Sequence, residues 1–115
     1  MTLIPLENDQ ETISQRFRKT DYFMSIDNGE IKVEINEHKL SKSNEFFKHF
    51  ETLGVTKLYL KALGYKTFLR LDALQIEVYL IKESKLSAHI DENSLLKIDK
   101  ENAEAFCTLG HKTKV

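Results

Sequence analysis

The clearest hydrophobic pattern in the chain is a pair of alternating segments on either side of Asn28-Gly29. The alternating apolar residues are Tyr22, Met24 and Ile26 before this pair and Ile31, Val33 and Ile35 after it. Asn-Gly favours a two-residue type I′ turn because both central residues of that turn adopt positive φ. The pattern therefore predicts a β-hairpin of strands 21–27 and 30–36 with one apolar face.

Residues 54–81 show a second pattern, which predicts a strand, a helix and a strand. The stretches 55–61 and 76–81 contain near-continuous apolar runs, typical of strands buried on both faces. Residues 65–74 have apolar positions at helical spacing, although residues 66–71 also alternate as in a strand. The helix is favoured because strands buried on both faces need helices to cover them. A strand-helix-strand unit makes its two strands parallel.

Three further elements complete the predicted fold. The spacing of Phe46, Phe47, Phe50 and Leu53 predicts a helix over 43–53, capped by Ser43 and stopped by Gly54. Apolar residues around Pro5 predict a first strand over 2–6, and Asp99 is a candidate cap for a last helix over 99–109.

The sequence thus predicts an α/β fold with a mixed five-stranded sheet (strands 2–6, 21–27, 30–36, 55–61 and 76–81). A single domain is expected over residues 1–115, with residues 111–115 frayed.

Composition narrows the class of protein. Seventeen Lys and Arg residues against eighteen Asp and Glu residues give a net charge of −1, which argues against a general nucleic-acid or anionic-membrane surface. The N-terminal residues do not resemble a signal peptide, and no apolar run is long enough to span a membrane. The one cysteine, Cys107, cannot form an intramolecular disulfide. A soluble cytoplasmic protein is expected.

Three segments, in sequence order, carry a family resemblance. They are Ile4-Pro5, then Ile13-Ser14-Gln15-Arg16-Phe17-Arg18 with Asp21-Tyr22-Phe23, then Leu53-Gly54-Val55 through Leu60, Gly64 and Phe68 to Ile76-Glu77-Val78-Tyr79. In this order and spacing, residues 3–81 resemble the dinitrogenase iron–molybdenum cofactor biosynthesis family, the small nitrogenase accessory domains. The resemblance implies a ribonuclease-H-like fold with helices on the faces of the sheet. It also implies a non-catalytic carrier of iron–sulfur or iron–molybdenum clusters, with cluster-assembly or nitrogenase-type proteins as partners.

The chain departs from the family pattern at several positions. The family's histidine falls on Arg16 and its next glycine on Arg18, and another histidine position falls on Ser43. Ala62 and Gln75 stand where the family has glycines. These departures motivate an alternative function, a non-catalytic protein-binding domain that kept the fold and lost the cluster ligands.

The candidate binding residues are Arg16, Arg18 and Gly64. The two arginines lie where the family's loop approaches its ligand, and two guanidinium groups can bind an anionic group bidentately. Gly64 stands at a strand-to-helix junction, where a helix N-terminus can hold an anion. For each of them a structural role, in a solvated loop or in close helix–strand packing, is the alternative.

The candidate metal ligands are Cys107 and His111, a thiolate and an imidazole across a helix end. Cys107 could equally be a small core residue beside Phe106. Among the other histidines, His38 is expected in solvent and His49 at the border of an apolar stripe. An enzyme using His89 with Asp91 as an acid/base pair is the third hypothesis, although no nucleophile accompanies them.

Overall fold

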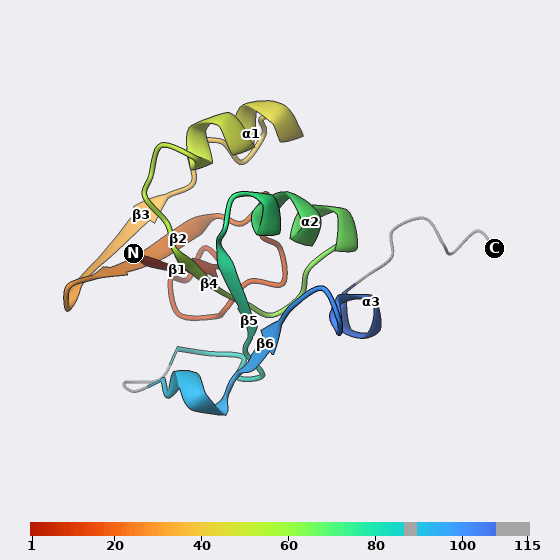
Figure 1. The fold of residues 1–115 in the computed structure, drawn as a ribbon. Helices are drawn as coiled ribbons and strands as arrows, with labels where there is room; N and C mark the ends of the chain where they lie inside the picture. Colours follow the sequence, from red (N-terminus) through yellow and green to blue (C-terminus); the bar gives the residue numbers. More distant parts are fainter. Residues whose placement is uncertain (87–89, 108–115) are drawn as a thin grey trace.

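A computed structural model describes residues 1–86 and 90–107, which form one mixed sheet with helices packed against it (Figure 1). The strands are β1 (Thr2–Leu6), β2 (Tyr22–Asp27), β3 (Glu30–Ile35), β4 (Lys57–Leu60), β5 (Glu77–Leu80) and β6 (Leu96–Ile98). They lie in the order β3-β2-β1-β4-β5-β6. β1 is parallel to β4 and β4 is parallel to β5, whereas the other neighbouring strands are antiparallel. The helices are α1 (Ser43–Phe50), α2 (Tyr65–Ala73), α3 (Ala103–Phe106) and a short 3₁₀ helix, η1 (Glu92–Ser94).

The predicted hairpin is confirmed as β2 and β3. Asn28 and Gly29 have φ of 51° and 82°, as a type I′ turn requires. The predicted cross-strand pairs are also confirmed, namely Ile26 with Ile31, Met24 with Val33 and Tyr22 with Ile35. The apolar face is nevertheless open at β3, where Ile31 is 61% and Ile35 64% exposed, because β3 is the outer strand of the sheet.

The predicted crossover unit is confirmed as β4, α2 and β5. The two strands are parallel, and residues 66–71 are helical, which excludes the strand alternative. Leu58, Leu60 and Val78 are at most 1% exposed, whereas Leu80 is half-buried at the end of β5. The near-continuous apolar runs therefore did indicate strands covered on both faces.

Three features of the predicted fold are wrong. Within residues 1–86 and 90–107 the sheet has six strands rather than five, because Leu96–Ile98 pairs antiparallel with β5. The helix predicted over 43–53 ends at Phe50, and its N-cap is Lys42 rather than Ser43. The last helix begins at Ala103 rather than Asp99. The Asp99 carboxylate accepts hydrogen bonds from the N–H groups of Glu101 and Asn102, which form a turn before the helix.

The core forms two clusters on opposite faces of the sheet. One packs α1, α2 and α3 against the sheet, and Figure 1 shows α1 and α2 on the same side. The other contains Ile4, Leu6, Met24, Tyr59 and Tyr79 with loop residues Ile13 and Ile81. Leu86, Ile90 and Leu95, from the chain between β5 and β6, pack against this second cluster. Across the described residues, no helix is long and apolar enough to cross a lipid bilayer.

A candidate anion-binding site between two loops

The strand order reverses direction between β1 and β4. The two strands are parallel neighbours, so their carboxyl ends lie at the same edge of the sheet. From β1 the chain continues to β2 on one side, and from β4 it continues through α2 to β5 on the other. In open α/β sheets, ligands bind in the crevice outside the carboxyl ends of the strands at such a reversal.

A hollow of about 360 Å³ lies where the loops after β1 and β4 meet. Its lining residues come from these two loops and the first turn of α2: Gln15, Arg16, Phe17, Arg18, Lys19, Ala62, Leu63, Gly64 and Thr67. We call this site the basic hollow. It brings together the three candidate binding residues named from the sequence, Arg16, Arg18 and Gly64. Lys19 and Thr67 were not among the candidates, although Lys19 adjoins Arg18 and Thr67 lies one turn beyond Gly64.

The arginine loop is anchored by the burial of Phe17. Its ring is 6% exposed and meets the rings of Phe46 and Phe50 edge-on, with centroids 5.3 and 5.4 Å away. The flanking Arg16 is exposed and Arg18 is half-buried. The apolar anchor in the core therefore fixes the backbone on either side of Phe17, from which the two arginine side chains extend.

Buried polar side chains hold the end of the same loop. The Asn36 amide donates to the carbonyl oxygens of Arg18 and Thr20 at 2.8 and 3.0 Å. The Thr20 hydroxyl donates to the carbonyl of Leu6 at 2.7 Å, tying the loop to the last residue of β1. The Arg18 guanidinium reaches the carbonyl of Ser41 at 3.5 Å. These contacts place the loop backbone before any ligand arrives.

The N-terminus of α2 forms the other side of the basic hollow. Gly64 is the N-cap, and no side chain among the described residues caps the helix. The first N–H groups of a helix lack intrahelical partners and carry partial positive charge. No Asp or Glu lies in the first turn to neutralise it. Three cationic residues (Arg16, Arg18 and Lys19) and a helix N-terminus thus line one concave site, a composition that suits an anionic ligand.

Cys107, one of the two candidate metal ligands, lies in the core rather than in the basic hollow. It is 7% exposed within the cluster that joins the helices to the sheet. Burial raises the pKa of its thiol, which disfavours the thiolate form that binds metals. His111 lies outside the described residues. Within residues 1–86 and 90–107, no group of three or more His, Cys, Asp or Glu side chains is placed to hold a metal ion.

Two of the remaining histidines, His38 and His49, lie against each other and outside the basic hollow. His38 was expected in solvent, but it is half-buried, with its ring 4.2 Å from that of His49 and its Nδ1 3.0 Å from the Ser41 hydroxyl. His49 is likewise half-buried at the edge of the apolar stripe of α1, as predicted. His89, on which the enzyme hypothesis depended, lies outside the described residues.

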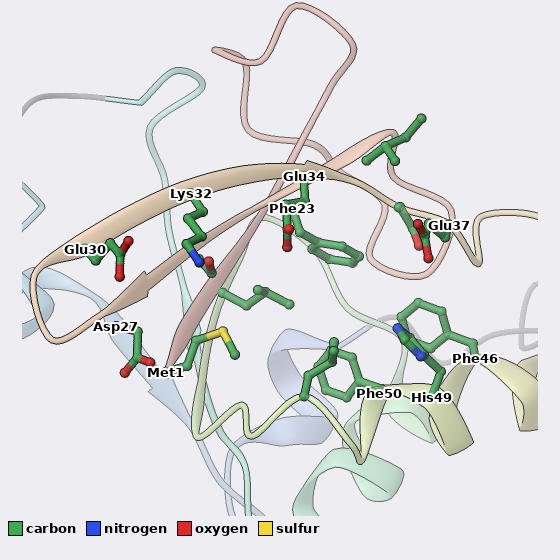
Figure 2. Close-up of a pocket in the computed structure, with 15 residues that line it drawn as sticks. Met1, Phe23, Asp27, Glu30, Lys32, Glu34, Glu37, Phe46, His49 and Phe50 are labelled. Atoms are coloured by element: carbon green, nitrogen blue, oxygen red, sulfur yellow. The ribbon is translucent and has the colours of Figure 1, made fainter.

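A larger hollow, of about 570 Å³, lies between the β2–β3 hairpin and α1 (Figure 2). Its floor is apolar, and Figure 2 shows Phe46 and Phe50 of α1 facing the strands. Four carboxylates stand around it, those of Asp27, Glu30, Glu34 and Glu37. This charge opposes an anionic ligand, so the smaller basic hollow is the better candidate for one despite its size.

Comparison with solved structures gives a relative by fold. The chain is similar to the NMR structure of a Thermotoga protein, provisionally named a NifB protein, that belongs to the DUF35 family. The TM-score is 0.56 at 22% sequence identity, over 73% of this chain and 78% of the other. At that identity the likeness shows the fold alone. No family model matches the chain, and no curated protein matches it either.

Proposed function

We propose that this chain binds an anionic iron–sulfur or iron–molybdenum cluster in the basic hollow and carries it, without catalysis, to a cluster-assembly or nitrogenase-type protein in the cytoplasm. The main support is the meeting of Arg16, Arg18 and Lys19 with the N-terminus of α2 around one concave site. The name of the Thermotoga relative and the ordered sequence motifs favour the same class. The proposal includes a ribonuclease-H-like classification, in which β1 to β5 form the common sheet and β6 is an added edge strand.

The chemistry of the site suits a cargo rather than a resident group. Guanidinium and ammonium groups bind anions through charge-assisted hydrogen bonds, which form and break without covalent change. A permanently bound cluster is instead held by several cysteine thiolates, and this chain has one cysteine. A cluster held in the basic hollow would keep ligands of its own and leave with them.

Binding of a preformed cluster tests this function. The probe is an iron–sulfur cluster carrying small thiolate ligands, mixed anaerobically with the protein and measured as iron retained after gel filtration. We expect the Arg16→Gln/Arg18→Gln double variant to bind the cluster about tenfold more weakly, since it loses two charge-assisted contacts. The matched control is Lys48→Gln/Lys100→Gln, which removes the same charge outside the basic hollow and should leave cluster binding unchanged.

Two outcomes would contradict the proposal: no retained iron on the folded wild type, or equal losses in the arginine variant and its control. Iron lost only on Cys107→Ala would instead support ligation by Cys107 and His111. No binding to the folded wild type would favour the alternative of a non-catalytic protein-binding domain. That alternative is motivated by Arg16 at the family's histidine position and by the buried Cys107 thiol.

A further inference from the structure

The outer strand β3 has a self-complementary sequence. Among the described residues, β3 pairs with β2 alone and forms one edge of the sheet. Its residues Glu30–Ile35 alternate between charged and apolar. Ile31, Val33 and Ile35 are 61%, 38% and 64% exposed on one face. Figure 2 shows Glu30, Lys32 and Glu34 on the other face, toward the larger hollow.

The backbone groups of the apolar residues point out from this edge. A two-residue turn makes Asp27 and Glu30 a hydrogen-bonded pair, and such pairs alternate along an antiparallel ladder. The N–H of Asn36, donated to the carbonyl of Asp21 at 2.9 Å, is in phase with this alternation. The N–H and C=O groups of Ile31, Val33 and Ile35 therefore face away from β2 and are available to another strand.

We propose that two copies of this chain associate by antiparallel pairing of their β3 strands, with Val33 opposite Val33 of the second copy. In this register the three outward-facing residues meet as hydrogen-bonded pairs, Ile31 opposite Ile35 on each side of Val33. Lys32 of each copy then lies opposite Glu34 of the other. The two apolar rows adjoin on one face, and two opposite-charge pairs form on the other.

Charge complementarity selects this register over its neighbours. A shift of two positions one way places Lys32 opposite Lys32 and Glu30 opposite Glu34. A shift the other way places Glu34 opposite Glu34. Like charges directly opposite each other destabilise a strand pair. A shift of one position puts apolar residues on the charged face. β3 also has no proline, a residue that at an edge strand often prevents pairing with another chain.

Six residues of strand make a small interface, so the association should be weak and should depend on protein concentration. Sedimentation velocity on the full chain, from about 5 μM to about 500 μM, measures it by mass action. Lys32→Glu and Glu34→Lys each create two like-charge pairs, and each should weaken the dimer by about tenfold. The double swap Lys32→Glu/Glu34→Lys should restore it, and an equimolar mixture of the two single variants should form a heterodimer.

Two further variants control the experiment. Glu30→Lys changes the net charge as much as Glu34→Lys does, but position 30 lies opposite Asn36 in the proposed register, so the dimer should persist. Val33→Pro removes the central N–H donor at an edge position that tolerates proline and should give a monomer. A wild type that stays monomeric over the whole range overturns the proposal, as does a dimer that the single charge variants leave intact.

Discussion

At the scale of single residues, Tyr59 and Glu92 connect the sheet to the segment that precedes β6. The Tyr59 hydroxyl and the Lys57 ammonium each donate to Glu92 Oε1 at 2.9 Å. Burial, and after it the hydrogen bond to Glu92, raise the pKa of Tyr59 to about 12. The hydrogen bonds from Lys57 and Tyr59 in turn lower the pKa of Glu92.

This network predicts a loss of stability at high pH. The pKa of Tyr59 is raised from its ordinary value of 10.0 to about 12 by folding, so the unfolded chain releases this proton first. The free energy of unfolding should therefore fall as the pH rises from 10.0 to about 12. Urea unfolding at a series of pH values measures this decline.

Tyr59→Phe is the matched variant for this prediction. It removes one titrating group and one hydrogen bond, so it should lower stability by about 1 kcal/mol at neutral pH and make the alkaline decline shallower. Some decline should persist, because the pKa values of Tyr79 and Lys57 are also raised. An alkaline decline of unchanged slope in Tyr59→Phe would show that Tyr59 does not contribute to it.

At the scale of secondary-structure elements, the hairpin turn depends on the backbone of Gly29. Gly29 has a φ of +82°, and a Cβ added there would meet no atom within 4 Å. Gly29→Ala should therefore cost about 1 kcal/mol through backbone strain alone. Gly29→Asn is the control, since asparagine tolerates a positive φ better than alanine does and should cost less. Equal losses of stability in urea unfolding would refute the role assigned to the turn.

The elements that the sequence predicts are those whose local signals agree. In the hairpin, alternation and the Asn28-Gly29 turn specify the same register. In the crossover unit, two apolar runs require the covering helix that α2 supplies. The strand β6 was missed because three residues carry too little pattern, and its position depends on pairing with β5. The last helix is predicted too long, because Asp99 caps a turn and the helix begins only at Ala103.

The residues of the candidate site can be predicted from the sequence, but their proximity cannot. Sequence motifs predict Arg16, Arg18 and Gly64 as candidate binding residues. No local pattern predicts that the two loops containing them lie side by side. That proximity depends on the parallel pairing of β1 with β4, a tertiary contact. The burial of Cys107 could likewise not be decided from its neighbours, since a thiol at a helix end suits both a ligand and a core residue.

At the scale of the whole molecule, the near-zero net charge conceals a separation of charge. The basic hollow lies at the carboxyl ends of β1 and β4, whereas four carboxylates stand around the larger hollow beside β2 and β3. The edge strand β3 is separated from β1 by β2 in the sheet. Pairing of two chains through β3 is therefore compatible with an open basic hollow in each copy.

The location of a bound cluster tests the central claim most directly. A paramagnetic iron–sulfur cluster broadens the NMR signals of nearby amides, so the amide spectrum of the loaded protein can be compared with that of the free protein. We predict selective broadening at residues 15–19 and 62–67, which surround the basic hollow, with the signals of the Asn28-Gly29 turn, at the opposite end of β2, preserved. Broadening centred on Cys107, or no broadening of any amide at saturating cluster, would contradict the assignment of this site.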